Sequence, residues 1–359
     1  MRQTDRSQSA TVKAQQVGDQ PSPLFDLSHL RNIKDVGRAL GVDGTHLAIV
    51  LYGNGPPAYY REFTIKKKGG GVRTIASPRP VLRSLQVSTA DLLRPLATPK
   101  GSAHGYVEGR SIVTNARNHL GQRHVLNIDL LKFFPSINFG RVRGVLMAPP
   151  FNCGPDAATA LAQLCCLKNE LPIGAPTSPL LSNIVCMRLD SHLQRLAKHR
   201  GCWYTRYSDD ITLSTSRESF PRTLARVSHG RTIVGPELRR VVTENGFAIN
   251  DGKSRLQSSL GHQEVTGITV NESLNVNRTY VRNVRAMLHS LDRDGLAGSQ
   301  LKMEELYAER DRYPGARPSF QSVLRGRLAY LAMVRGSDDP LVLKMLSRYH
   351  ELIARDSTR

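Results

Sequence analysis

The central feature of the sequence is Tyr204-Thr205-Arg206-Tyr207-Ser208-Asp209-Asp210-Ile211-Thr212-Leu213. Aromatic and β-branched residues lead into a polar Ser-Asp-Asp, and alternating apolar residues follow, which is typical of a β-hairpin with two acids at its turn. Adjacent carboxylates repel each other and resist desolvation, so burying them requires a compensating cation. For an isolated Asp-Asp pair, however, a solvated turn is the more common explanation.

A third aspartate changes this interpretation. Asp129 ends another strand-like run, Val125-Leu126-Asn127-Ile128-Asp129. If the two strands are neighbours in a sheet, three carboxylates converge on one point. Because these hard oxygen ligands stand without a nearby His or Cys, the pattern favours magnesium or manganese over zinc.

Composition points to a nucleic-acid partner. With 359 residues, of which 40% are hydrophobic, the chain is long enough for two or three packed subdomains. Its formal net charge of +20 indicates a polyanionic partner. The charge is concentrated, because residues 61–124 contain twelve Lys or Arg and three acids. We therefore expect a binding surface there rather than a general solubility feature.

The sequence predicts a cytoplasmic protein without a membrane segment. Its start, Met1-Arg2-Gln3, is polar and does not resemble a signal peptide. No apolar run approaches the ~18–20 residues of a membrane-spanning helix. The five cysteines are odd in number and lack C-x-x-C spacing, which indicates reduced thiols rather than a disulfide framework or a zinc site.

The N-terminal part of the chain begins with a polar segment, residues 1–23, which we expect to be a disordered tail. Apolar residues then recur at helical spacing between Leu24 and Leu51. Gly41 and Gly44 interrupt this spacing, so it predicts two short helices.

Residues 63–76 resemble a β-hairpin whose loop is formed by three consecutive glycines. That register puts Lys68 opposite Val72 and Lys67 opposite Arg73. Like charges directly opposed across a ladder are destabilising. Two explanations remain open: an anion such as a triphosphate lies between the side chains, or the basic edge discourages sheet aggregation.

Periodicity predicts most of the remaining elements. Helices are expected over residues 81–96, 112–120, 156–169 and 233–245, after Pro179, and through the basic C-terminal part, with a strand pair over residues 264–271. Asn115 and His119 share one face of their helix, where hydrogen bonding to a neighbouring loop is more common than catalysis. The Gly- and Pro-rich segment around Gly174 forms a bend whose backbone can approach a ligand closely.

Taken in order, these segments resemble the reverse transcriptases, and the retron type in particular. The Asp129 strand is similar to the first palm motif, residues 174–179 to the second, and Tyr207-Ser208-Asp209-Asp210 to the Tyr-x-Asp-Asp box. Residues 246–253 resemble the motif with a lysine near the leaving group. Two further signatures, Asn-Ala-x-x-His at residues 115–119 and Val-Thr-Gly at residues 265–267, favour retrons over group II intron or retroviral enzymes. A single short motif is weak, but several in the right order over roughly residues 25–335 are specific.

The resemblance implies an α+β fold with right-hand polymerase architecture: fingers, a palm with an antiparallel sheet and helices, and a mainly helical thumb. The implied boundaries are 1–23 for the tail, 24–124 for N-terminal helices and fingers, 125–262 for the palm with some fingers elements interleaved, and 263–359 for the primer-grip region and thumb.

Catalytic and metal-binding roles follow from the resemblance. Asp129, Asp209 and Asp210, with the Leu130 carbonyl, would hold two Mg²⁺ ions, or Mn²⁺ ions, and Asp210 would be the most replaceable of the three acids. Lys253 would give a proton to the pyrophosphate leaving group.

Substrate roles follow in the same way. For the incoming deoxynucleotide, Lys67 and Arg73 would clamp the triphosphate, Phe134 would exclude a 2′-OH, and the Gly174 backbone would lie close by. For RNA and primer, the implied residues are Asn115, His119, Val265, Thr266, Gly267, Arg325 and Arg327. The chain departs from many relatives at Ile173, where they have Gln, and at Lys66, where Pro is common. The second departure leaves open which of Lys67 and Lys68 reaches the phosphates.

The resemblance implies that the enzyme binds a structured noncoding RNA and primes from the 2′-OH of an internal guanosine, which gives a branched RNA–DNA hybrid (msDNA). It also implies a role in phage defence, often together with an effector protein. Two alternatives are weighed. The first is a bacterial reverse transcriptase of another lineage, such as a group II intron-like, diversity-generating or CRISPR-associated form. The second is an RNA-binding scaffold with a silent polymerase centre, against which the three intact acids argue.

Overall fold

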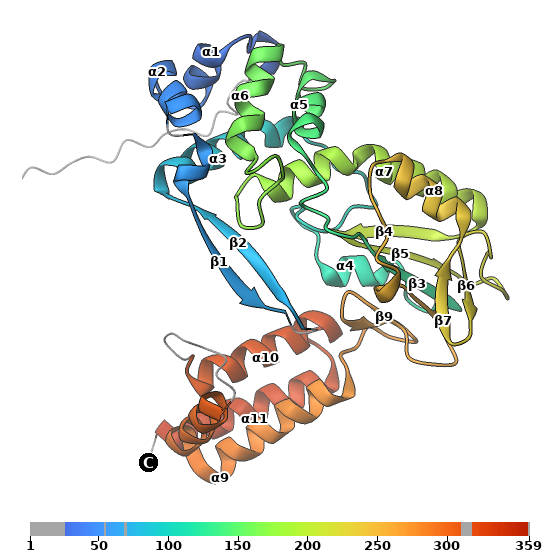
Figure 1. The fold of residues 1–359 in the computed structure, drawn as a ribbon. Coiled ribbons are helices and arrows are strands. Elements are labelled where there is room, and N and C mark those ends of the chain that lie inside the picture. The colour runs from blue at the N-terminus through green and yellow to red at the C-terminus, as the bar shows by residue number, and fades with distance from the viewer. Residues whose placement is uncertain (1–25, 54, 68–69, 310–317, 358–359) are drawn as a thin grey trace, which may run out of the picture.

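The computed structural model describes residues 26–53, 55–67, 70–309 and 318–357. The expected tail, residues 1–23, and Lys68 lie outside these residues. Figure 1 shows N-terminal helices at one end, a central sheet, and a C-terminal helical bundle, with one long hairpin pointing from the N-terminal helices toward the bundle. The predicted mixture of helices with antiparallel sheet is confirmed. Among the described residues, no helix has the length and apolarity needed to cross a membrane.

The central sheet is antiparallel and has the strand order β4-β5-β3-β8. Its strands are β3 (His124–Asp129), β4 (Trp203–Tyr207), β5 (Asp210–Thr215) and β8 (Arg255–Ser258). Apolar side chains of β3 and β5, such as Leu126, Ile128 and Ile211, are fully buried. The two inner strands therefore anchor the sheet in the core, and their ends carry the acidic residues.

Helices pack around this sheet, and all of them except α4 (Ile112–Arg117) join it to the N-terminal part in one apolar core. In chain order they are α1 (Ile33–Ala39), α2 (Gly44–Ala48), α3 (Pro80–Leu93), α4 (Ile112–Arg117), α5 (Phe139–Met147), α6 (Pro155–Cys165), α7 (Ser178–Arg200) and α8 (Pro236–Glu244). Short 3₁₀ or π turns occupy Leu27–His29, Ile49–Gly53, Pro56–Tyr59, Arg94–Leu96 and Asp251–Lys253. The long helix α7 packs on β4 and on α8 (Figure 1).

The long hairpin consists of β1 (Tyr60–Lys66) and β2 (Val72–Pro78). The expected register is wrong by two residues on β1: Ile65 lies opposite Arg73, and Lys66 lies opposite Val72. The reason is the loop, which begins at Lys67 and closes with a hydrogen bond from its N–H to the Gly71 carbonyl. Gly70 and Gly71 both have positive φ, which glycine adopts without steric cost. Thus no two basic side chains face each other directly across the strands, and the electrostatic argument for an anion between them is lost.

Three helix boundaries also differ from expectation. The helix expected over residues 233–245 begins at Pro236, because residues 231–234 instead form β7 (Arg231–Val234), which pairs with β6 (Ala225–Ser228). The helix expected to reach Asn169 ends at Cys165, since Lys168 and Asn169 adopt positive φ in a turn. The helix expected to reach Leu120 ends at Arg117 and continues as turns.

The C-terminal part has a second apolar core. It contains the small hairpin β9 (Glu264–Val265) and β10 (Ile268–Thr269), followed by α9 (Arg278–Glu309), α10 (Phe320–Arg335) and α11 (Pro340–Ser357). Val113, Ala116 and Val125 join this core from α4 and β3. The bundle is therefore packed against one end of the central sheet through the small hairpin.

Candidate active site

The three aspartates lie together at one end of the central sheet. Asp129, the last residue of β3, is the register partner of Asp210, the first residue of β5. The Leu130 N–H donates to the Asp209 carbonyl at 3.0 Å, which ties the residue after Asp129 to the turn between β4 and β5. The expectation that the two strands are neighbours is confirmed. Asp129 therefore shares one site with two consecutive acids that follow it by about eighty residues in the sequence.

The electrostatics of this site favour a bound cation. Burial, followed by the nearby charge of Asp129, raises the pKa of Asp209. Burial, then Asp209 and Asp129, raises the pKa of Asp210 to about 6. Such shifts mean that the folded chain disfavours the ionised acids, and a divalent ion with oxygen preference would relieve this cost. The residues present therefore fit such an ion.

The Asp129 carboxylate already has two partners from the segment before β8. Lys253 Nζ donates to Oδ1 at 2.7 Å, and Asn250 Nδ2 donates to Oδ2 at 3.1 Å. The hydrogen bond to Asp129 raises the pKa of Lys253. Within the described residues, no three His, Cys, Asp or Glu side chains form a group ready to hold a metal ion as they stand. Lys253 thus lies beside the acids, and its ammonium supplies positive charge next to Asp129.

The predicted nucleotide-binding residues come from three segments. In the register of the β1–β2 hairpin Ile65 lies opposite Arg73, and Lys67 follows β1 as the first residue of the loop. Lys67 and Arg73 therefore lie near the same end of the hairpin although they are not directly opposed. Gly174 lies against β2 with φ of +120°, where a Cβ would stand 2.8 Å from the Ala76 carbonyl oxygen. The neighbouring Ile173 carbonyl accepts from the Ala76 N–H at 2.8 Å. The bend at Gly174 therefore anchors the hairpin.

Phe134 is half-buried and lies in an aromatic row. Its ring centroid is 5.2 Å from that of Phe133 and 6.3 Å from that of Tyr106. The Tyr106 hydroxyl accepts a hydrogen bond from Ser208 Oγ in the acidic turn. Phe134 is thereby connected to the acidic turn through one intervening residue.

The residues of the two retron signatures are in contact in the structure. Asn115 and His119 are buried, and Asn115 Nδ2 donates to Thr266 Oγ1 at 3.5 Å. His119 bonds through both ring nitrogens, to Ser214 Oγ at 2.6 Å and Thr205 Oγ1 at 2.7 Å, and burial lowers its pKa to about 3. A neutral His119 therefore joins β4 to β5. Neither side chain faces solvent here, so an effect of either on RNA binding would be transmitted by the elements it holds.

The predicted primer-grip residues form the tight turn between β9 and β10. Val265 is buried and pairs with Ile268, whereas Thr266 and Gly267 both adopt positive φ at the tip. Positive φ at both central residues matches a primed hairpin turn, in which glycine is favoured. The tip is accessible beside the C-terminal bundle, where Arg325 is exposed and Arg327 stacks over Tyr280 at 5.8 Å.

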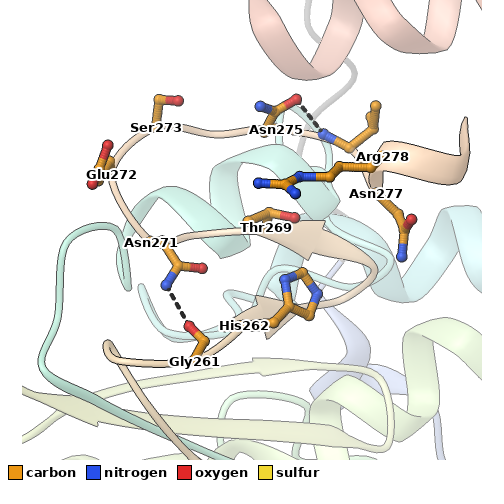
Figure 2. Close-up of a pocket in the computed structure, with 10 residues that line it drawn as sticks. Gly261, His262, Thr269, Asn271, Glu272, Ser273, Asn275, Asn277 and Arg278 are labelled. Carbon is orange, nitrogen blue, oxygen red and sulfur yellow. Dashed lines mark hydrogen bonds between the residues drawn. The ribbon is translucent and has the colours of Figure 1, made fainter. Parts of the chain in front are cut away.

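A pocket of about 570 Å³ lies between this small hairpin and the start of α9. Figure 2 shows His262, Thr269, Asn277 and Arg278 among its lining residues, with a hydrogen bond from Asn271 to the Gly261 carbonyl at its base. No sequence motif pointed to this pocket, because its residues become neighbours only when the hairpin folds back.

Sequence reasoning also missed a buried network beneath the acidic turn. Arg206 has no exposed surface and forms a bidentate ion pair with Asp190 of α7, both hydrogen bonds being 2.7 Å long. The available signal was that Arg206 is a charged residue inside a strand-like run whose other residues are typical of buried positions. A charged side chain in such a position requires a buried partner.

Comparison with known proteins agrees with this geometry. The family described as "Reverse transcriptase (RNA-dependent DNA polymerase)" matches residues 65–270. The Retron Mx65 reverse transcriptase of Myxococcus xanthus is 40% identical over 249 residues, covering 64% of this chain and 56% of that protein. The Retron Mx162 reverse transcriptase of the same species is 32% identical over 305 residues, covering 77% and 63%. The chain thus spans little more than half the length of the first relative and under two thirds of the second.

A third relative is matched over more of its own length. The Retron Ec86 reverse transcriptase of Escherichia coli is 31% identical over 265 residues, which cover 73% of this chain and 78% of that protein. The reverse transcriptase match spans more than half of the 359 residues and includes all three aspartates of the site. The family match and these relatives agree with the antiparallel sheet and its acidic turn, and they show that the chain belongs to the retron reverse transcriptases.

Proposed function

We propose that this chain is an RNA-directed DNA polymerase that copies part of a structured noncoding RNA into DNA. The observation that carries the proposal is the pairing of Asp129 with Asp210 beside the Asp209 turn. Its net charge of +20 suits a nucleic-acid template and product. Its retron relatives support the retron form over intron-like, diversity-generating or CRISPR-associated forms, and the intact acids argue against a silent scaffold.

Asp129, Asp209 and Asp210, with the Leu130 carbonyl, would hold two divalent ions, for which Mg²⁺ is the first candidate and Mn²⁺ the second. Bound there, such ions supply Lewis acidity and charge neutralisation for displacement at the α-phosphate. Lys67 and Arg73 bind the triphosphate, Arg73 through its planar fork and Lys67 as a point charge. Lys253, held 2.7 Å from Asp129, carries the proton that pyrophosphate needs when it leaves.

Phe134 sets the choice of sugar in this proposal. A rigid aromatic ring beneath the sugar leaves no room for a 2′-OH and no polar partner for it. The ring is held by Phe133 and Tyr106, so the exclusion is steric. DNA is therefore the expected product.

The direct test is primer extension on an RNA template with deoxynucleotides and Mg²⁺, comparing the natural chain with Asp209→Asn. Synthesis by the natural chain is expected, and the variant should lose it while keeping its circular dichroism and melting temperature. Asp156→Asn, at an exposed acid in the first turn of α6, is the matched control and should remain active. A fully active Asp209→Asn enzyme contradicts the assignment.

The retron-specific steps need a separate test. We propose that synthesis begins at the 2′-OH of an internal guanosine and gives a branched RNA–DNA molecule. In this proposal the product serves phage defence in the bacterial cytoplasm, together with an effector protein. The protein purified from its host should carry a hybrid in which DNA is linked through a 2′-oxygen, detected by its sensitivity to a 2′–5′ debranching enzyme. Linear RNA alone would refute this priming mode and leave the polymerase assignment standing.

A further inference from the structure

The turn that carries Asp209 is held by side chains that the proposed chemistry does not use. Ser208, the residue before Asp209, has φ of +60°, an uncommon conformation for a residue other than glycine. Such a conformation persists only where the surroundings impose it. The elements that impose it here are β4, α7 and the segment of residues 102–106.

Arg206 makes the connection between these elements. Its Nη1 donates to the Ser208 carbonyl at 3.1 Å, while Nε and Nη2 donate to the two Asp190 carboxylate oxygens at 2.7 Å. Nη2 also donates to Asn183 Oδ1 at 3.1 Å, and the Tyr204 hydroxyl donates to Asp190 at 2.7 Å. The fork is therefore fixed by two residues of α7 before it reaches the turn.

The segment of residues 102–106 holds the other side of the turn. The Arg206 N–H donates to the Ser102 carbonyl at 2.8 Å, and the His104 N–H donates to the Arg206 carbonyl at 2.7 Å. Asn183 Nδ2 donates to the Gly105 carbonyl at 2.9 Å. A Cβ at Gly105 would stand 2.5 Å from the Ser208 nitrogen, so the backbone of this segment is in close contact with the turn.

We propose that Arg206 and Asp190 are positioning residues for Asp209: their ion pair fixes the Ser208 turn and so sets the separation of the Asp209 carboxylate from Asp129. The pair is buried, with side-chain exposures of 0% and 1%, and acts by geometry because its two charges compensate each other. Carboxylates that share metal ions must be held to within a fraction of an ångström. The pair therefore determines how tightly divalent ions bind and how fast synthesis proceeds. This inference rests on the proposed polymerase function.

The test replaces the whole pair with apolar residues of similar size, Arg206→Met with Asp190→Leu. Removing one partner leaves a buried unpaired charge, whereas replacing both is often neutral for stability. The double variant should therefore fold and bind RNA but lack the donor to the Ser208 carbonyl. The matched control is Arg200→Met with Glu237→Leu, an ion pair between α7 and α8 that does not contact the turn.

Three readouts separate positioning from general stability. Relative to the natural chain, the double variant should bind Mn²⁺ several-fold more weakly by electron paramagnetic resonance without nucleotide present. It should exchange the amide hydrogens of residues 204–210 faster. It should also lose about tenfold to 100-fold in kcat, with the deoxynucleotide KM changed by less than about twofold. The control should leave all three unchanged even if its melting temperature falls.

Unchanged Mn²⁺ affinity and exchange in a folded double variant overturn the inference, whatever its activity. Arg206→Lys provides a second variant should the double variant fail to fold. A single ammonium keeps the charge but cannot bond Asp190 at both oxygens and the Ser208 carbonyl together, so weaker Mn²⁺ binding is again expected, and natural affinity is again a refutation. Absence of synthesis by the natural chain, by contrast, would refute the proposed function. The two failures can be told apart, because the metal-binding and exchange measurements do not depend on synthesis.

Discussion

At the scale of single residues, Asp210 opposes folding when no metal is bound. Its pKa rises from 3.8 to about 6 because of burial and the charges of Asp209 and Asp129. An acid with a raised pKa in the folded chain destabilises it above that value, and the cost disappears as the pH falls toward the unfolded pKa. With EDTA present, the metal-free chain should thus gain stability from this group as the pH falls from about 6 to about 4.

Asp210→Asn should remove this pH-dependent cost. In EDTA the variant is expected to melt about 2 °C above the natural chain at pH 8, and the two should melt together near pH 4. The gain is small because the Asp210 residue retains solvent contact. Differential scanning calorimetry across this pH range measures it. A difference that does not vary with pH would show that ionisation of Asp210 is not its cause.

Phe134 offers a second test at the same scale. Phe134→Ala opens space next to Tyr106 and should raise ribonucleotide incorporation relative to deoxynucleotide incorporation by roughly tenfold to 100-fold. Competitive primer extension measures the ratio of kcat/KM for the two substrates. Trp203→Ala, at an exposed aromatic residue at the start of β4, is the control and should leave the ratio unchanged. Unchanged rejection of ribonucleotides by Phe134→Ala would remove this residue from sugar selection.

At the scale of secondary-structure elements, the β1–β2 hairpin depends on Gly174 for its placement. A Cβ there would meet the Ala76 carbonyl oxygen and Ile75 Cγ2, and φ of +120° is strained for any other residue. Gly174→Ala should therefore break the bond between the Ile173 carbonyl and the Ala76 N–H and displace the hairpin. Because Lys67 and Arg73 lie on that hairpin, the deoxynucleotide KM is expected to rise more than kcat falls.

Steady-state kinetics on a fixed primer and template measure that separation of KM from kcat. Gly144→Ala, within α5 where a Cβ meets no atom within 4 Å, is the matched control and should leave both constants unchanged. Equal losses in kcat and in apparent affinity would indicate general damage to the fold rather than movement of the hairpin.

Elements with strong local patterns could be predicted from the sequence, and those set by distant contacts could not. The β4–β5 hairpin and the long helix α7 have clear periodicity and were placed correctly. The β1–β2 register was wrong because a glycine run permits several loop lengths, and packing chooses among them. Residues 233–234 were assigned to a helix because the pairing of β7 with β6 is not visible in local propensity.

The candidate site shows the same division. The acids were found because Asp209 and Asp210 stand in a short motif and Asp129 ends a strand-like run, and β3 proved to be the neighbour of β5. Arg206 was missed because its partners, Asn183 and Asp190, lie on a helix that precedes it in the chain by about twenty residues. A helix and a strand bring such residues together only through tertiary packing, which no spacing rule encodes.

At the scale of the whole molecule, the proposed function leads to a test of where nucleic acid binds. The net charge is +20, and the β1–β2 hairpin points toward the C-terminal bundle in Figure 1. The acids lie at one end of the central sheet. The pocket in Figure 2 opens at the junction of the small hairpin and α9, and Arg278 and His262 line it. A structured RNA bound along the bundle, as the proposed function requires, would pass this pocket, where the Arg278 guanidinium can contact a phosphate.

Arg278→Ala should then weaken RNA binding in a salt-dependent manner. Each phosphate contact releases condensed counterions, so removing one should reduce the slope of log affinity against log salt by about 0.7 to 0.9. Fluorescence anisotropy with a structured RNA, measured from low to moderate potassium chloride, gives this slope. Arg38→Ala removes an equal charge from α1, which lies at the opposite end of the molecule from α9, and should leave the slope unchanged (Figure 1). An equal change of the slope in both variants would show that RNA binding depends on the net charge of the protein and not on a contact at this pocket. The reason is that a diffuse electrostatic field does not distinguish the two ends of the molecule.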